Sequence, residues 1–247
     1  MGFRNLFGKE IRSMLPLYGV FAVVMVALDF FILYKSKTWA NDVEMVLSLM
    51  IPFIFAGVLA VGTGYYQLQS EWKTNSIYLL LSLPIRGWKV LTAKLAAVLC
   101  LFLGTLLWIA ACFSVILLRS KWGELMEAAE PSQWLPGLLN TAANSLWMYV
   151  LVVLFLTAVS QFAFLCGQLV AKLKWLVVLS AFLGAVWLVI RVTPLLSQLL
   201  EWTPDIFFGG LDLDAAYLHS GPFIVLLLLS IGLIWLNGYI FEKEVEV

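Results

Sequence analysis

Charged residues and histidine are scarce in this sequence. Asp, Glu, Lys and Arg together make up 12% of the 247 residues, and His219 is the only histidine. A zinc enzyme of the H-E-x-x-H type needs two histidines one helical turn apart, so the sequence excludes that class. Serine catalysis would need a general base close to a serine, and the apolar segments offer no convincing pair. An intramembrane enzyme is therefore disfavoured.

Cysteine pairs and a nucleotide site are missing as well. Cys100, Cys112 and Cys166 lie within apolar runs without a C-x-x-C pair, so they indicate neither a metal site nor a disulfide. The stretch GFRNLFGKE at the start differs from the P-loop pattern G-x-x-x-x-G-K-[ST], because its glycines are one residue too far apart and Glu10 replaces the hydroxyl residue. We therefore expect a chain that is not an enzyme by itself and binds no cofactor or metal.

Apolar residues, in contrast, are abundant. They form 63% of the chain, and the mean hydropathy is +0.98. A soluble domain of this length could not bury so much apolar surface, so the bilayer is the expected solvent. A spanning helix needs about 20 mostly apolar residues. We predict six spans, of which the fifth is short: Met14 to Tyr34, Val43 to Leu68, Val90 to Leu118, Leu146 to Val170, Trp175 to Ile190 and Pro222 to Phe241.

Lys and Arg are distributed unequally between the two sides of such a protein. With the N-terminus in the cytoplasm, ten of the 15 fall on the cytoplasmic side and five fall outside. The positive-inside rule then predicts a multi-pass protein of the plasma membrane with both termini in the cytoplasm. The inner set is Arg4, Lys9, Arg12, Lys73, Arg86, Lys89, Lys94, Lys172, Lys174 and Lys243, and the outer set is Lys35, Lys37, Arg119, Lys121 and Arg191.

Three segments outside the spans carry further structure. Residues 1–13 place apolar residues on one helical side and basic residues on the other, which predicts a helix in the membrane interface, with a plain charged flank as the alternative. Residues 120–140 are expected to form a loop. Within residues 191–220, an apolar piece broken by Pro194 and Pro204 is too short to span, and a pair of re-entrant or interfacial helices is expected.

Few polar side chains lie within the spans, so each is a candidate for a substrate path. An acid in a membrane span is costly, and Asp29 is therefore either a substrate or gating residue or the partner of Lys35 or Arg191. Gln161 and Gln168 are seven residues apart and share one helical face. That face could line a cavity, or its amides could form hydrogen bonds to neighbouring helices.

The most informative stretch runs from Gln69 to Ala97, QSEWKTNSIYLLLSLPIRGWKVLTAKLAA. It is charged, partly amphipathic and set between two apolar runs, as expected for a short surface helix that meets a soluble partner. Pro84 ends or turns a helix there. A cytoplasmic extension of the two spans without any partner is the alternative interpretation.

This stretch resembles the membrane subunit of ABC-2 type transporters. The similarity lies in Glu71 after the second span, then YLLLSLP from Tyr78, a basic residue at Arg86 and a Lys entering the third span. Six spans with both ends in the cytoplasm and a basic amphipathic start agree with the family's layout over essentially the whole chain. The motif itself covers about 30 residues, Glu71 to Ala97 with its flanks, and is moderately specific.

The resemblance implies a single ABC-2 transmembrane domain over residues 1–247. It has an elbow helix at 1–13, a cytoplasmic coupling segment at 69–89 and a re-entrant segment at 191–220. The coupling segment would dock on a separate ATPase subunit that binds ATP and Mg²⁺, and a second copy of this or a similar permease subunit would complete an exporter. Nucleic acid is not an expected partner. The ATPase-coupling residues would be Glu71, Trp72, Lys73, Tyr78, Leu80, Leu81, Pro84 and Arg86.

The expected function is export of a hydrophobic or amphipathic substrate, such as a peptide, an antibiotic or a lipid-like molecule, because the spans carry few fixed charges. A self-sufficient secondary transporter or channel is the alternative. It would place ionisable residues deep in several spans, whereas Asp29 stands nearly alone. Co-purification of an ATPase subunit separates the two.

Overall fold

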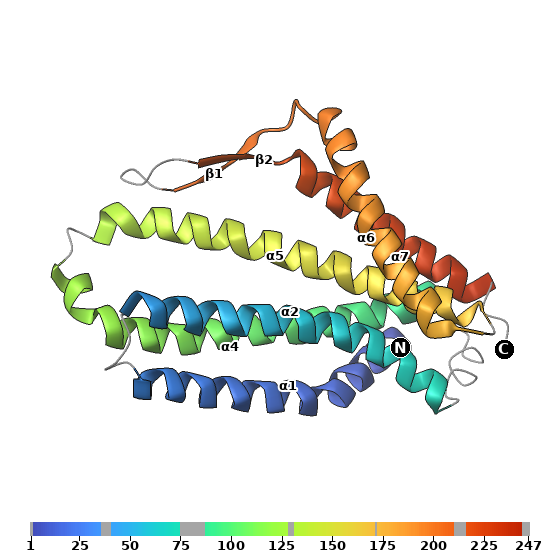
Figure 1. Cartoon of the computed structure of the whole chain (residues 1–247), viewed down its shortest axis with the longest axis horizontal. Coiled ribbons are helices and arrows are strands. Elements are labelled where there is room, and N and C mark those ends of the chain that lie inside the picture. Colours follow the sequence, from blue (N-terminus) through green and yellow to red (C-terminus); the bar gives the residue numbers. More distant parts are fainter. Residues whose placement is uncertain are drawn as a thin grey trace. The chain divides into compact units, whose positions relative to one another are not determined.

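The described residues of the chain form six long helices and one short β-hairpin (Figure 1). The computed structural model describes residues 2–35, 41–74, 87–127, 131–170, 172–209 and 216–243, without the side chains of some residues next to the gaps. The elements are α1 (Gly2–Lys35), α2 (Asn41–Lys73), α4 (Gly87–Glu127), α5 (Pro131–Gln168), α6 (Lys174–Gln198), β1 (Asp205–Phe208), β2 (Ala216–His219) and α7 (Gly221–Lys243).

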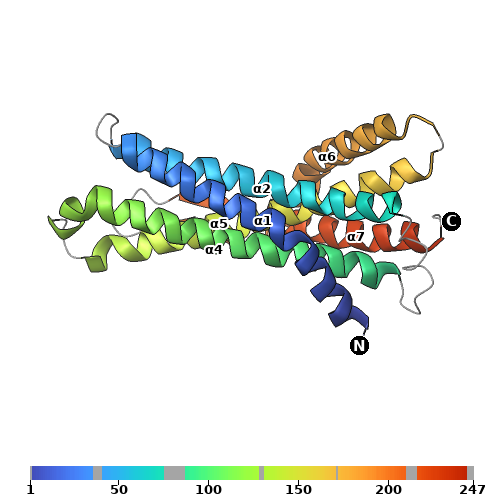
Figure 2. The ribbon, with the colours of Figure 1, turned by 90° about the horizontal axis from the view of Figure 1, so that it is seen from below.

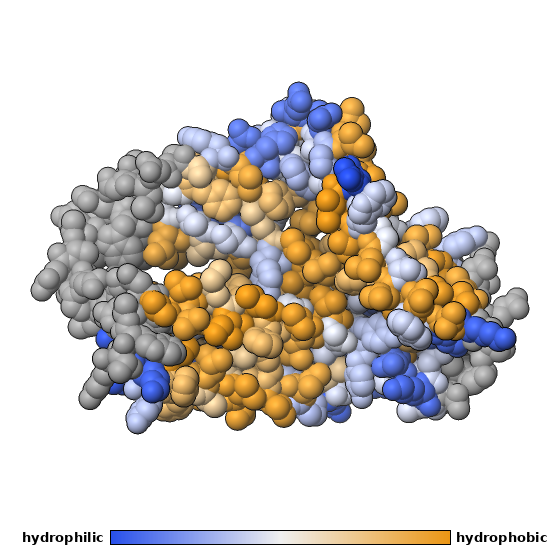
Figure 3. Space-filling view, viewed as in Figure 1, coloured by the Kyte–Doolittle hydropathy of each residue, from blue (hydrophilic) through white to orange (hydrophobic). Residues whose placement is uncertain are grey.

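All six helices are long and apolar enough to cross a membrane. The shortest, α7, has 23 residues, which at about 1.5 Å per residue exceeds the roughly 30 Å of bilayer hydrocarbon. The prediction of an all-helical, multi-pass membrane protein is thus supported. Large apolar side chains are exposed along the helices, among them Leu107, Leu183 and Trp235. Figure 3 shows such residues in orange over the helices.

Residues 120–140 differ from the expected loop. Helix α4 continues to Glu127 and α5 begins at Pro131, so most of this stretch is helical. The residues SKWGELME contain several good helix formers. A proline is well placed at the first position of a helix, because its fixed φ suits the helix and its missing N–H is not needed there.

The chain divides into two compact units. The first contains residues 1–63 and 96–128, and the second contains residues 64–95 and 129–247. Helices α2 and α4 therefore contribute one part to each unit. Each unit is described by itself.

In the first unit, α1 buries a stripe of side chains that recur on one helical face: Met14, Tyr18, Met25 and Ile32. The Tyr18 hydroxyl lies 3.0 Å from Thr63 Oγ1 of α2. Helix α1 begins at Gly2 and continues to Lys35, so a separate interfacial helix over residues 1–13 is not confirmed. Pro16 lies inside α1, and Figure 2 shows a bend near that end of the helix. Proline removes one backbone hydrogen bond and kinks a helix.

In the second unit, α5 is the central helix. In the 18-residue apolar stretch of α5, 67% of the residues are buried, whereas in the corresponding stretch of α6 only 6% are buried. Phe155 and Val159 of α5 pack with Val189 of α6, and Leu226 and Leu229 of α7 join this core. In Figure 1, α6 and α7 meet α5 near its C-terminal end and diverge from it towards the strands.

The segment after α6 contains a β-hairpin where a pair of re-entrant helices was expected. Strands β1 and β2 pair antiparallel, with Asp205 opposite His219, and the described residues of this segment include no further helix. Aromatic and β-branched side chains favour a strand, and Gly209 adopts a left-handed φ of 115° that ends β1. Pro194 lies inside α6 and does not end it.

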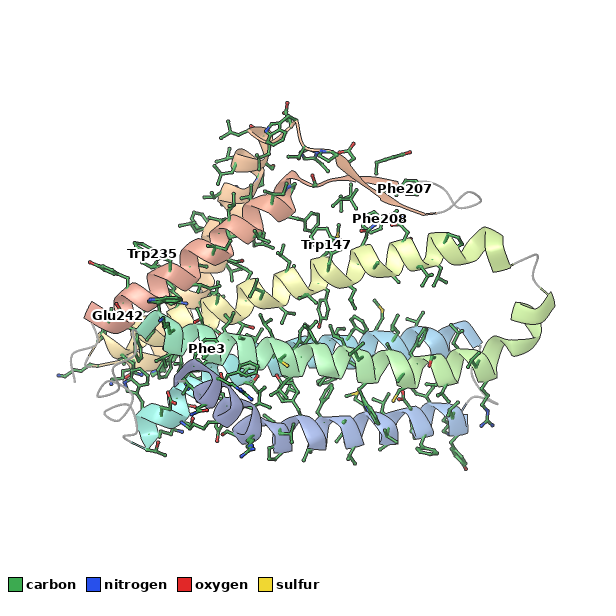
Figure 4. All side chains as sticks on the ribbon, turned by 180° about the vertical axis from the view of Figure 1, so that it is seen from behind. Phe3, Trp147, Phe207, Phe208, Trp235 and Glu242 are labelled. Atoms are coloured by element: carbon green, nitrogen blue, oxygen red, sulfur yellow. The ribbon has the colours of Figure 1, made fainter. Side chains whose placement is uncertain are left out.

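Two asparagines attach this hairpin to α5. The Nδ2 atoms of Asn140 and Asn144 each donate to the carbonyl oxygen of Phe207 at 2.9 Å. Trp147 packs edge to face on Phe223 at the start of α7, with 5.4 Å between ring centroids. Figure 4 shows Trp147 and Phe208 between α5 and the strands.

Candidate functional site

A buried ion pair joins the end of α2 to the start of α4. Lys94 Nζ lies 2.7 Å from Glu71 Oε1, and the two side chains are 1% and 7% exposed. Glu71 lies just before α2 ends at Lys73, and Lys94 lies two turns into α4. Residues 75–86, which connect these helices, are outside the part that the structure describes. The ion pair therefore lies at the base of the predicted coupling segment.

This ion pair stabilises the protein through the attraction between its two charges. Burial of each charge by itself is unfavourable. Removing two charges from water costs several kcal/mol each, and the attraction between them offsets that cost only when the geometry is good. The separation of 2.7 Å between Lys94 Nζ and Glu71 Oε1 brings the two charges into direct contact. Removing one partner leaves the other charge buried, so the pair fixes one arrangement of α2 and α4. It sets where the connecting segment begins and ends.

Aromatic side chains hold the same end of α2 to α5 and α7. The Trp72 ring lies edge to face with Phe164 of α5 at 5.1 Å and with Phe241 of α7 at 6.1 Å between centroids. Tyr65, two turns earlier, meets Phe164 at 5.3 Å. Aromatic pairs in this geometry add about 0.5–1.5 kcal/mol beyond their buried area. The end of α2 is thus packed inside the unit.

The start of α4 lies close to α7 because two glycines allow it. A Cβ atom on Gly238 would lie 2.5 Å from Trp88 Cβ, and one on Gly87 would lie 2.6 Å from Phe241 Cδ1. The Trp88 backbone N–H points to Glu242 Oε1 at 3.4 Å. Any larger residue at either glycine would push the helices apart. We call this packed region, formed by Glu71, Trp72, Gly87, Trp88, Lys94, Phe164, Gly238 and Phe241, the helix junction.

Buried amide groups lie next to the helix junction. Gln67 and Gln161 are each 1% exposed. Both side-chain amide atoms of Gln67, and Nε2 of Gln161, have no hydrogen-bond partner among the described residues. Gly64 touches Thr157 and Ser160, so helical spacing places Gln67 and Gln161 at the same level of the α2–α5 contact. A buried amide of this kind is typical of a site that holds water or changes partners.

The structure places the predicted coupling residues in two groups. Glu71 and Trp72 are anchored in the helix junction, and Lys73 is exposed at the end of α2. Glu71 was expected to offer a docking contact. Its carboxylate instead meets Lys94, because it lies one turn after the buried Gln67 on the inner face of α2. Tyr78, Leu80, Leu81, Pro84 and Arg86 lie outside the described residues.

The predicted substrate-path residues do not lie together. Gln161 is buried beside the helix junction, whereas Gln168 accepts a hydrogen bond from Lys174 Nζ at 3.2 Å across the α5–α6 turn. Asp29 belongs to the first unit. It is 8% exposed, and its carboxyl group lies within hydrogen-bonding reach of the Cys112 thiol of α4. No ion pair between Asp29 and Lys35 is present in the described part of that unit. Arg191 lies in the other unit.

Lys94, Gln67 and Cys112 are residues that the sequence did not single out as site residues. The signal for Lys94 was present, since a lysine in the apolar stretch LTAKLAA requires a partner. No pattern marked Cys112, because a cysteine in an apolar helix behaves as a small apolar residue. Its place beside Asp29 follows only from the packing of α1 on α4.

Comparison of the chain with models of protein families, with curated proteins and with solved structures finds no match. Among the described residues, no group of three His, Cys, Asp or Glu side chains could hold a metal ion.

Proposed function

We propose that this chain is the permease subunit of an ATP-driven exporter of the ABC-2 type. Two copies would combine with two separate ATPase subunits that bind ATP and Mg²⁺. The chain would lie in the plasma membrane with both termini in the cytoplasm. Its substrate would be hydrophobic or amphipathic: a peptide, an antibiotic or a lipid-like molecule.

The observation that carries this proposal is the buried ion pair between Glu71 and Lys94, which belong to the two helices that residues 75–86 connect in sequence. A segment that receives force from a soluble ATPase must be rigidly joined to the helices that it moves. The ion pair joins α2 to α4, and Trp72 joins α2 to α5 and α7. Motion of the segment would therefore be passed to four helices together. A connecting loop without a coupling role would not need its two helices to be joined in this way.

In this proposal Glu71 and Trp72 are positioning residues, and the docking contacts come from Lys73, Tyr78, Leu80, Leu81, Pro84 and Arg86. The ATPase would hydrolyse ATP, and its closure would displace the segment and the helices attached to it. The buried amides of Gln67 and Gln161 lie in the α2–α5 contact. In this proposal, the two amides gain hydrogen-bond partners when that contact shifts.

The test is purification of the tagged chain from its native membrane, followed by mass spectrometry and an ATP-hydrolysis assay. We expect a P-loop ATPase to co-purify. Reversing a charge in the segment, Arg86→Glu, or replacing Leu80 and Leu81 with Asp, should lower the bound ATPase about tenfold, because a central apolar contact contributes most of the binding energy. Lys37→Glu, the same reversal at the expected outer end of the spans, is the matched control.

If Arg86→Glu and the double replacement of Leu80 and Leu81 both retain as much ATPase as the control, the coupling role is overturned. If no ATPase co-purifies with the wild-type chain, the proposed exporter function is overturned. Orientation is tested separately with an impermeant thiol reagent on intact cells, in a cysteine-free background. A cysteine at Ser36 should be labelled, and a cysteine at Asn75 should not. Labelling at position 75 would reverse the topology.

The alternative is a transporter or channel that works without ATP. The observation that favours it is Asp29, a buried acid that forms no ion pair among the described residues. Proteoliposomes that contain only this chain distinguish the two. Uptake driven by an ion gradient alone would favour the alternative.

A further inference from the structure

Three buried amide side chains lie inside the second unit, on three different helices. Gln67 of α2 and Gln161 of α5 are each 1% exposed, and Asn237 of α7 is 0% exposed. Both side-chain polar atoms of Gln67, Nε2 of Gln161 and Oδ1 of Asn237 have no hydrogen-bond partner among the described residues. Burial of a polar atom without a partner is unfavourable, and proteins supply such atoms with a partner. These amides therefore require a ligand that can form hydrogen bonds.

Helices α2 and α5 run in the same direction where they meet. A Cβ atom on Gly64 of α2 would lie 2.6 Å from Thr157 Cγ2 of α5. About two turns later along both helices, the Trp72 ring of α2 meets the Phe164 ring of α5. The α2 glutamine lies one turn after Gly64, and the α5 glutamine lies one turn after Thr157. Residues three or four apart share a helical face, so the two glutamines lie at one level of this contact.

Helix α7 meets α5 at the same level. Asn237 Nδ2 donates a hydrogen bond to the carbonyl oxygen of Ala158 at 3.0 Å. Ala158 follows Thr157, and Gln161 lies about one turn after both of them. Gln161 is therefore between the side of α5 that meets α2 and the side that meets α7. We call the three side chains of Gln67, Gln161 and Asn237 the amide cluster.

The unpartnered atoms of the amide cluster include both donors and acceptors. The Nε2 atoms of Gln67 and Gln161 donate, whereas Oε1 of Gln67 and Oδ1 of Asn237 accept. A cation would bind only the oxygen atoms, and an anion would bind only the N–H groups. The Glu71–Lys94 ion pair, one turn after Gln67 on α2, adds one charge of each sign and favours neither ion. A water molecule both donates and accepts, so it fits this set of atoms best.

We propose that the amide cluster binds ordered water molecules between α2, α5 and α7. A buried water makes about three hydrogen bonds, so about two water molecules are enough for these atoms. Bridging waters can exchange partners, and protein groups can replace them when α2 moves along α5. The waters thus give three helices a shared polar contact in an apolar interior. This site goes beyond the exporter function and does not depend on it.

The direct test is X-ray hydroxyl-radical footprinting of the full-length chain in lipid nanodiscs, read by mass spectrometry. Radicals that form on ordered water oxidise the side chains beside it, even where these are buried. Phe164, one turn after Gln161, should be oxidised several-fold faster than Phe155. Phe155 is the matched control, because it lies on the same helix, is 4% exposed against 2% for Phe164, and packs in an apolar core. Equally slow oxidation of the two rings would overturn the proposal.

A substitution distinguishes bound water from a dry amide. Gln67→Met keeps the length of the side chain and removes both polar atoms. If water is bound, it loses partners, so the midpoint of thermal unfolding should fall by several degrees and the oxidation of Phe164 should fall several-fold. A dry amide gives the opposite result, because removing an unpaired polar group raises the midpoint. Gln69→Met, at a partly exposed position of the same helix, is the matched control and should change neither quantity.

A bound cation is distinguished by the choice of salt. The wild-type chain should unfold at the same midpoint in potassium chloride, sodium chloride and choline chloride of equal ionic strength, because water needs none of these cations. A higher midpoint in one metal salt that Gln67→Met abolishes would overturn water in favour of that cation. If Gln67→Met is not recovered in folded form, Gln161→Met and the wild-type footprint decide the outcome. These assays contain no ATPase, so their failure leaves the proposed exporter function untouched.

Discussion

Glu71 and Asp29 are both acids buried in helices long enough to span a membrane, and they have different partners. Glu71 lies 2.7 Å from a lysine in the second unit, and Asp29 lies beside a thiol in the first. The surroundings differ as well, because Glu71 lies in a closely packed helix junction, whereas Asp29 lies on the buried stripe of α1 with Met25 and Ile32. Glu71 has a fixed counter-charge that holds two helices together, whereas Asp29 has no counter-charge among the described residues.

The largest effect that tests this comparison is expected at Lys94. Replacing Lys94 with Met removes the counter-charge and leaves Glu71 buried, which should lower the free energy of unfolding by about 3–5 kcal/mol. Denaturant unfolding of the purified protein in detergent measures the change. The double variant with Glu71→Leu should recover most of the loss, because no buried charge then remains unpaired. A single variant as stable as the wild type would show that the pair does not hold the junction.

A smaller effect is expected from the close approach of α4 to α7. Gly238→Ala places a Cβ atom within 2.5 Å of Trp88 Cβ and 3.0 Å of its Cα, and overpacking of this kind costs about 1–3 kcal/mol. Gly232 lies on the same helix with nothing within 4 Å of a built Cβ. Gly232→Ala should therefore be neutral or stabilising by up to about 1 kcal/mol, since alanine favours a helix. Equal effects at both positions would contradict the packing described for the junction.

The smallest effect is expected at Asp29 itself. Asp29→Asn removes the charge and keeps the size, and it breaks no ion pair of the described residues, so stability should change by less than about 1 kcal/mol. The same unfolding assay makes the result directly comparable with Lys94→Met. A loss as large as that of Lys94→Met would mean that Asp29 is paired with a cation, and the comparison between the two acids would fail.

Much of the fold could be predicted from the sequence. The six apolar runs correspond to six helices, and their bounds differ mainly where a helix continues past the apolar run, as at Gly2–Ser13 and at Glu127. The helical pair expected after Arg191 is not confirmed. In the described residues the piece DIFF, which is short, aromatic and followed by glycine, pairs as a strand. Local propensity outweighed the analogy with the family there.

The candidate site was less predictable. Glu71 and Trp72 were singled out, but as docking residues, since a charge next to a loop is usually exposed. Lys94 was counted as a positive charge on one side of the membrane, and not as the partner of a buried acid. Whether two such charges meet depends on the rotation of α2 and α4 about their own axes. The residue pattern of one helix does not predict the rotation of the other helix.

The sequence by itself determined that this chain has six segments long and apolar enough to cross a membrane, with few charges inside them, because apolar length and charge content are properties of each segment alone. Only the tertiary structure decided which buried acid is paired. Glu71 meets Lys94, and Asp29 meets Cys112, through contacts between helices that are far apart in the chain. In an apolar interior the partner of a charge determines its energy, so the two acids, alike in sequence, acquire different roles.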